Sequence, residues 1–213
     1  MFADSRQRLV ASLAFATLAV ACVSPVVPAC DETVTIDSTE YPIGDFWCGR
    51  RLDSTEIADP GDLVQLPQEL TFQEYRIYVL PETRDAFVAM ARAAEADSIS
   101  LRADSGFRSP NFQRRIIRGR LERGDGFETI LKSVAPPGYS EHHTGRALDL
   151  CPSEAIFAFT DTYTWLKKNA GEYGFYETLP EDPKAPLTWE SWHWAYLGVD
   201  SNVVKQPSDT ADN

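Results

Sequence analysis

The sequence is poor in basic residues and in histidine, and it contains no internal repeat. Among its 213 residues, 20 are lysine or arginine and 32 are aspartate or glutamate, so the formal net charge is −12 and the pI is about 4.7. A surface that follows nucleic-acid phosphates needs an excess of basic residues, and this composition therefore argues against a nucleic-acid partner. Hydrophobic residues make up 43% of the chain, which is typical of one packed globular domain rather than of a disordered, collagen-like or coiled-coil chain.

The main hydrophobic run lies near the N-terminus, from Leu9 to Val23, and has 15 residues. A membrane-spanning helix needs about 20 residues, so this run is too short to form one. Arg6 and Arg8 precede it, and the pattern is typical of a secretory signal. We therefore expect residues 1–29 to be a signal peptide, whose removal takes the net charge from −12 to −13, and the mature protein to be exported.

Four cysteines bear on the mature chain. Cys22 and Cys30 each follow small or apolar residues in a pattern that loosely resembles the bacterial lipobox, so either is a candidate start of the mature chain and a candidate site for a lipid anchor. If the chain begins at a lipidated Cys30, Cys48 and Cys151 remain, and an oxidising exterior favours a disulfide bond between them. The alternative is that Cys151 is a small buried side chain with a free thiol.

Hydrophobic periodicity predicts a mixed α+β domain. The pattern predicts helices over residues 82–95, 127–134 and 162–173 and strands over residues 99–103 and 147–150. Ser109 followed by Pro110 predicts the start of a further helix, and Gly174 is placed to end the third helix.

The chain has three histidines, and all lie in segments dense in polar and aromatic residues: His142, His143 and His193. A catalytic zinc ion takes about three protein ligands from imidazole or carboxylate groups and leaves one position for water. His142, Asp149 and His193 supply that number, because a loop histidine and an aspartate on the strand at 147–150 can converge. His143 is the rival ligand to His142.

Glu190 is a candidate general base. In an extended strand it would not share a face with His193, but a bend at Ser191 would bring its carboxylate beside the metal-bound water. Trp192 and Trp194 should then face one side of the strand and His193 the other. Each of these residues also has an ordinary structural explanation: a histidine hydrogen-bonded in the core, an aspartate that caps or pairs locally, and a solvated glutamate.

Three segments carry a resemblance to a known family: SGFRSPNFQ at 105–113, SEHHTGRALD at 140–149 and ESWHW at 190–194. They resemble the signature blocks of the VanY-like D-alanyl-D-alanine carboxypeptidases. This zinc family also contains D-Ala-D-Ala dipeptidases and some L,D-carboxypeptidases, and it shares a fold with the Hedgehog signalling domain. The resemblance covers about residues 70–200 and implies a single compact α+β domain with a small antiparallel sheet and flanking helices.

The resemblance also implies roles for individual residues. The implied zinc ligands are His142, Asp149 and His193. Glu190 is the implied catalytic base, and Arg108 is implied to bind the substrate carbonyl during catalysis. Gln113 and Ser140 are implied to be further substrate-binding residues. The chain departs from the family at His143, Arg146 and Ser191, where the family often has glutamine, an apolar residue and proline. None of these departures removes a ligand. We expect His143 to form part of the site wall and Arg146 to be a surface charge, and the alternative for Arg108 is an ordinary solvated arginine.

The function that follows is zinc-dependent removal of the terminal D-alanine from peptidoglycan stem peptides in the periplasm or outside a bacterial cell, with membrane contact only through the signal or a lipid anchor. The signal argues against a cytoplasmic dipeptidase. Two alternatives stay open: an L,D-carboxypeptidase of the same family, and a non-catalytic zinc module that binds the cell wall. A penicillin-binding type of serine enzyme has little support, because the chain has neither an S-x-x-K nor a G-x-S-x-G motif.

We expect four parts along the chain: a signal peptide at 1–29, a turn-rich N-terminal extension that packs on the domain at 30–69, the peptidase domain at 70–200, and a disordered polar tail at 201–213.

Overall fold

The computed structural model describes residues 30–199, and its largest sheet has four antiparallel strands in the order β5–β6–β8–β7. These strands are β5 (Ala103–Ser105), β6 (Ala147–Leu150), β8 (His193–Tyr196) and β7 (Phe175–Tyr176). The register pairs Ser105 with Asp149 on one side and Asp149 with His193 on the other. Directly paired residues of an antiparallel sheet point to the same face, so the register itself brings Asp149 and His193 together.

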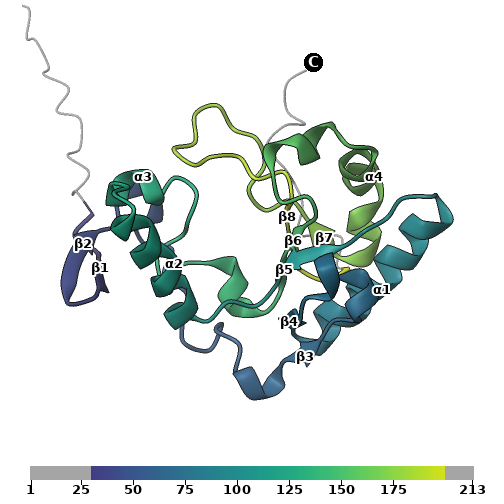
Figure 1. Ribbon diagram of the computed structural model, residues 1–213, viewed down its shortest axis with the longest axis horizontal. Helices are drawn as coiled ribbons and strands as arrows, with labels where there is room; N and C mark the ends of the chain where they lie inside the picture. The colour runs from purple at the N-terminus through teal and green to yellow at the C-terminus, as the bar shows by residue number, and fades with distance from the viewer. Residues whose placement is uncertain (1–29, 200–213) are drawn as a thin grey trace, which may run out of the picture.

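Two helices cover this sheet and form the first hydrophobic core with it (Figure 1). They are α1 (Pro81–Ala96) and α4 (Asp161–Asn169), and α4 continues into a 3-10 turn at Ala170–Tyr173. Gly174 ends that turn at a φ of 75°, a left-handed conformation that suits glycine. The helices predicted over 82–95 and 162–173 are confirmed, and so is the strand at 147–150.

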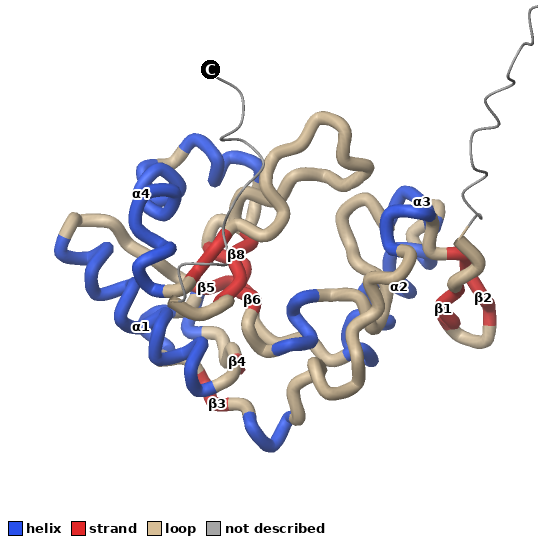
Figure 2. The backbone as a smooth tube through the Cα atoms, turned by 180° about the vertical axis from the view of Figure 1, so that it is seen from behind, coloured by secondary structure: helices blue, strands red, loops and turns tan. Residues whose placement is uncertain are grey.

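A second hydrophobic core lies on the other side of the molecule (Figures 1 and 2). It is built by the hairpin of β1 (Thr33–Ile36) and β2 (Thr39–Pro42) together with α2 (Pro110–Glu122) and α3 (Phe127–Ile130). Its buried residues are Val34, Ile36, Ile43, Trp47, Ile117, Phe127, Ile130, Leu131 and Tyr139. A small hairpin of β3 (Val64–Gln65) and β4 (Tyr78–Val79) precedes α1. The whole is an α+β domain with small antiparallel sheets and flanking helices, as the sequence predicted.

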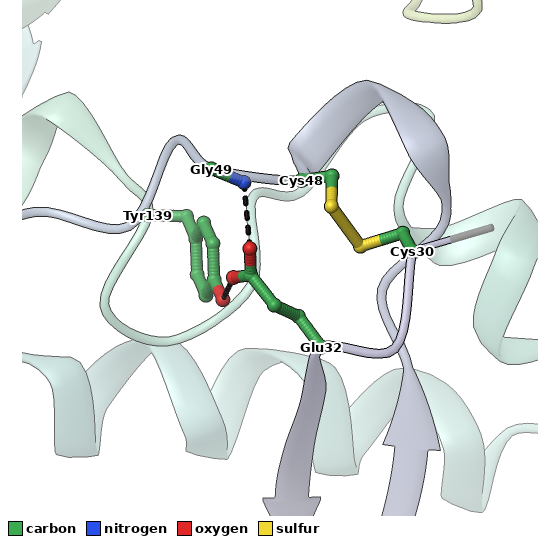
Figure 3. The surroundings of a disulfide bond; sticks show 5 residues. All are labelled: Cys30, Glu32, Cys48, Gly49 and Tyr139. Atoms are coloured by element: carbon green, nitrogen blue, oxygen red, sulfur yellow. Dashed lines mark hydrogen bonds between the residues drawn. A yellow bond between two sulfur atoms is a disulfide. The ribbon is translucent and has the colours of Figure 1, made fainter. Parts of the chain in front are cut away.

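The disulfide prediction is wrong. Cys48 is bonded to Cys30 at a Cα–Cα distance of 5.8 Å (Figure 3). Cys151 forms no disulfide with any residue from 30 to 199. Cys151 follows β6 in the first core, whereas Cys48 follows a turn of the second core, so the fold keeps these two cysteines apart. The disulfide occupies the thiol of Cys30 that a lipid anchor would need. Of the two candidate lipidation sites, this leaves Cys22, which lies outside the described residues.

Two elements are shorter than the sequence predicted. The helix predicted over 127–134 ends at Ile130, and the chain continues in turns to Val134, whose amide still donates to the Ile130 carbonyl at 2.9 Å. Pro136 has no N–H to offer the Lys132 carbonyl, which instead accepts a hydrogen bond from the Thr188 amide (2.6 Å). The strand predicted from residue 99 begins only at Ala103. Within residues 30–199, no helix combines the length and apolar character that crossing a membrane requires. The predicted signal peptide and polar tail lie outside this range.

Candidate metal centre and substrate cavity

His142, Asp149 and His193 converge on one point. Each offers a ligand atom, and these atoms all lie within 4.8 Å of one another. Nε2 of His142 is 3.3 Å from Asp149 Oδ2, and Nδ1 of His193 is 3.2 Å from Asp149 Oδ1. All three side chains are buried. Two imidazole nitrogens and one carboxylate oxygen form a donor set that suits zinc, so the residues present fit that metal.

The second ring nitrogen of each candidate histidine ligand is held by the protein. His142 Nδ1 donates to the Gly106 carbonyl at 2.6 Å, and His193 Nε2 lies 2.7 Å from Glu141 Oε2. A carbonyl oxygen can only accept, so the proton of His142 lies on Nδ1 and Nε2 is left as a lone-pair donor. Outer contacts of this kind fix the tautomer and the orientation of a metal-binding imidazole. The contact of Glu141 with His193 could not be read from the sequence, because 52 positions separate the two residues.

His143 does not point to this centre. It is fully buried, its Nδ1 donates to the Arg108 carbonyl at 2.5 Å, and its Nε2 accepts from the Gly138 amide at 3.1 Å. Both ring nitrogens are therefore used by the backbone. His143 therefore has a structural role and, contrary to expectation, is not among the residues that line the cavity described below, whereas His142 is the histidine of this loop that faces Asp149.

Arg108 lies directly beside the candidate ligands. Its guanidinium contacts Asp149 and lies 2.8 Å from His142 Nε2, while its Nε donates to Ser105 Oγ at 3.0 Å. The hydroxyl of Ser109 caps α2 by accepting from the Phe112 amide at 3.1 Å, which confirms the helix start predicted there. Arg108 lies in the short link between β5 and α2, and the Ser109 cap fixes the end of this link at the start of α2.

Glu190 reaches the same region through a turn. The His193 amide donates to the Glu190 carbonyl at 2.9 Å, so the chain bends at Ser191 as predicted, and both flanking tryptophans pack on the first core. Burial, together with the negative charge of Asp149, raises the pKa of Glu190 to about 7, although His193 and Arg108 act in the opposite direction. A carboxyl group with this pKa can accept and release a proton near neutral pH.

A cavity of about 250 Å³ joins these residues and is lined by Glu190, Arg108, His142, His193, Ser140 and Gln113, among others. Gln113 is buried, its Nε2 donates to the Ala135 carbonyl at 2.9 Å, and its Oε1 has no partner among the described residues. A buried acceptor without a donor is costly unless a ligand satisfies it. Ser140 caps the turn at Glu141–Thr144 by accepting from the His142 amide at 3.3 Å. Arg146 is a surface residue paired with Glu82 at 2.6 Å.

The N-terminal segment supplies one wall of this cavity, which the sequence did not predict. The wall residues from this segment are Phe46, Trp47, Arg50 and Leu52. The segment is tied to the loop before His142 in two places: the Leu52 amide donates to the Gly138 carbonyl at 2.9 Å, and the Tyr139 hydroxyl donates to Glu32 at 2.5 Å (Figure 3). Two aromatic residues directly before Cys48, Phe46 and Trp47, were the only signal of this wall in the sequence.

An α+β domain with two imidazoles and a carboxylate at one point, and a partly buried glutamate in the adjoining cavity, has the layout of a metal-dependent hydrolase. The sequence matches the profile of the VanY family, D-alanyl-D-alanine carboxypeptidase, over residues 76–199. The chain belongs to this family.

Individual relatives agree with this assignment. The YodJ protein of Bacillus subtilis is 32% identical over 162 residues, a match that covers 71% of this chain and 59% of YodJ. The bifunctional D-Ala-D-Ala dipeptidase and D-Ala-D-Ala carboxypeptidase VanXYC of Enterococcus gallinarum is 28% identical over 159 residues, which cover 68% of this chain and 79% of that protein. The chain thus spans less than two thirds of the length of YodJ.

Solved structures share the fold. The LdcB LD-carboxypeptidase superposes with a TM-score of 0.60 at 32% identity, covering 68% of this chain and 72% of LdcB. The structure of VanYB in complex with D-alanine-D-alanine gives a TM-score of 0.51 at 25% identity, covering 64% of this chain and 77% of VanYB.

Proposed function

We propose that this protein is a zinc-dependent carboxypeptidase that removes the terminal D-alanine from peptidoglycan stem peptides outside the bacterial cytoplasm. One observation carries the proposal: the three candidate ligands face one point, and Glu190 and Arg108 line the cavity at that point. Membership of the VanY family supports the reaction and the substrate class. The hydrophobic run and arginines within residues 1–29 support export, with the membrane contacted only through a signal or an anchor.

Different residues of the chain would then carry out different parts of the hydrolysis. His142, Asp149 and His193 would hold the zinc ion, which would lower the pKa of a bound water towards about 7 and polarise the substrate carbonyl. Glu190 takes a proton from the attacking water and passes it to the departing amine, so no covalent intermediate is needed. The guanidinium of Arg108 stabilises the negative charge that develops on the carbonyl oxygen, a contribution typically worth about 10²–10³ in rate.

Two other cavity residues are suited to binding the peptide. Gln113 Oε1 lacks a donor among the described residues and is suited to accept from a peptide N–H. The hydroxyl of Ser140 lines the same cavity. Both are uncharged. The positive charge that attracts the substrate's carboxylate comes from Arg108 and the metal at the centre and from Arg50 and Lys132 elsewhere in the cavity lining, against an overall charge of −12.

Two variants test the division of roles. Glu190→Gln should keep zinc after dialysis and lose turnover, whereas His193→Ala should lose the metal itself. Near-native release of D-alanine by Glu190→Gln, or an unchanged zinc content in His193→Ala, would remove the residue from its assigned role. Inhibition of the wild-type protein by a chelator but not by a β-lactam separates this mechanism from a serine acyl-enzyme.

An L,D-carboxypeptidase is the second candidate, because LdcB, an LD-carboxypeptidase, superposes with a higher TM-score than VanYB. The two reactions use the same metal chemistry and differ in the configuration of the residue before the scissile bond.

A further inference from the structure

Glu141 makes a contact that neither the motif nor the mechanism explains. It stands next to His142 in the chain, yet its carboxylate reaches the other histidine ligand, with Oε2 2.7 Å from His193 Nε2. The same oxygen accepts a hydrogen bond from the Thr178 hydroxyl at 2.6 Å. The imidazole of His193 is 5% exposed and the Glu141 side chain is 38% exposed, so the contact lies at the edge of the buried centre.

The two histidine ligands are held in different ways. A backbone carbonyl, that of Gly106, fixes His142, whereas a side chain fixes His193. Nδ1 of His193 faces Asp149, which is itself a candidate ligand. A metal ion bound by these side chains would be coordinated by Nδ1, so Nδ1 would no longer form a hydrogen bond to the protein. Glu141 would then be the one acceptor among residues 30–199 that keeps the His193 ring in place.

We propose that Glu141 is a positioning residue of the metal centre: its carboxylate orients the His193 imidazole for zinc, and Thr178 holds that carboxylate in place. A carboxylate that accepts the outer N–H of an imidazole also makes the inner nitrogen a better donor. Thr178 precedes Glu190 in the segment that joins β7 to β8, so this contact also ties the segment bearing the proposed base to the centre.

Zinc affinity, measured by competition with a chromogenic chelator, tests this role without any peptide substrate. Loss of an outer partner typically costs about 10–100-fold in metal affinity, and Glu141→Ala should show a loss of this size. Glu141→Gln keeps an acceptor oxygen but not the charge, and Thr178→Val removes only the hydroxyl, so both should show smaller losses. Glu128→Gln removes the same charge from an exposed site on α3 and should bind zinc like the wild type.

A double variant distinguishes a positioning role of Glu141 from a general effect of its replacement on folding. Thr178→Val added to Glu141→Ala should cost nothing further, because the hydroxyl acts through the carboxylate. Wild-type zinc affinity in a folded Glu141→Ala protein would overturn the proposal, as would an equal loss in Glu128→Gln. Should Glu141→Ala fail to fold, Glu141→Gln and Thr178→Val decide the question, and wild-type affinity in both overturns it. Because the readout is metal binding, the proposal can fail while the carboxypeptidase activity holds, and the reverse.

Discussion

Burial beside Asp149 raises the pKa of Glu190 to about 7, so at neutral pH this carboxyl group is poised between its protonated and ionised forms. A general base works best when its pKa is close to the ambient pH. The same environment has a cost in stability. A carboxyl group whose pKa is higher in the folded than in the unfolded chain binds more protons when folded, so the free energy of unfolding falls as the pH rises through this interval.

Replacing Glu190 by glutamine should therefore stabilise the metal-free protein. At about pH 8 the wild-type Glu190 carries a negative charge that the substitution removes. We therefore expect the free energy of unfolding of Glu190→Gln to exceed that of the wild type by about 2 kcal/mol. At about pH 4, where both side chains are neutral, the two proteins should unfold alike. Urea unfolding at the two pH values measures the difference.

Glu181→Gln is the matched control, because Glu181 is exposed in the same segment between β7 and β8 and its replacement should change little. A Glu190→Gln protein that is less stable than the wild type at the higher pH contradicts the description of Glu190 as a destabilised carboxylate.

Among the elements, the link between β5 and α2 controls the centre through its backbone. Gly106 lies in this link, and its carbonyl fixes Nδ1 of His142. A Cβ at this position would lie 2.6 Å from Cγ2 of Ile77 and 2.8 Å from the carbonyl oxygen of Tyr78. These distances are too short, so the link would have to move away from β4 and carry the carbonyl with it.

Gly106→Ala should consequently weaken both the fold and the metal site. We expect the free energy of unfolding to fall by about 1–3 kcal/mol, as for other overpacking substitutions, and the zinc affinity to fall as well. Thermal unfolding and chelator competition measure the two effects. Gly119→Ala is the control: it lies within α2 with only Arg123 Nη1 at 3.6 Å from the added Cβ, and it should stabilise the helix by about 1 kcal/mol. A Gly106→Ala protein with native zinc affinity contradicts the role given to this carbonyl.

The elements that the sequence predicted correctly are those defined by local patterns. Helix α1 has one apolar face, α2 begins at a serine cap, and β6 is a short apolar strand. The helix at 127–134 was predicted too long: after Ile130 the chain continues in turns, and the Lys132 carbonyl pairs with the Thr188 amide, 56 positions away, rather than with a helical neighbour. Periodicity carries no information about such distant partners.

In the candidate site, too, features set by local sequence patterns could be predicted, whereas contacts between distant residues could not. His142, Asp149 and His193 could be predicted because three histidines leave few choices and a motif fixes the spacing. The contact of Glu141 with His193 was missed because it depends on how β8 packs against the loop. The disulfide pairing was missed because it depends on which cysteines share a core.

At the scale of the whole molecule, the cavity lies where two hydrophobic cores meet. Strands β6 and β8, which carry two of the candidate ligands, belong to the first core. The second core contributes Trp47, Leu131 and Tyr139 to the cavity wall. The disulfide between Cys30 and Cys48 closes the N-terminal segment onto this second core (Figure 3). This wall of the cavity therefore depends on a bond that touches neither the candidate ligands nor Glu190.

Removal of this disulfide, in a Cys30→Ser/Cys48→Ser protein, should lower stability and loosen the wall. A bond that closes a loop of 18 positions contributes about 3 kcal/mol to the free energy of unfolding. We expect KM for a stem peptide to rise, while zinc affinity stays at the wild-type value. Cys151→Ser, which leaves the bond intact, is the control. An unchanged KM together with a lower zinc affinity would show that the segment supports the centre rather than the substrate.

Mass spectrometry of defined tetrapeptide and pentapeptide stems, after incubation with the zinc-loaded protein, shows whether the protein is a metal-dependent carboxypeptidase. The pentapeptide should lose a single terminal D-alanine, the metal-free protein and Glu190→Gln should release none, and added zinc should restore activity to the metal-free protein. Release from the tetrapeptide instead would assign the L,D reaction. If the zinc-loaded protein leaves both peptides intact, or cleaves them equally well without metal, the account is contradicted.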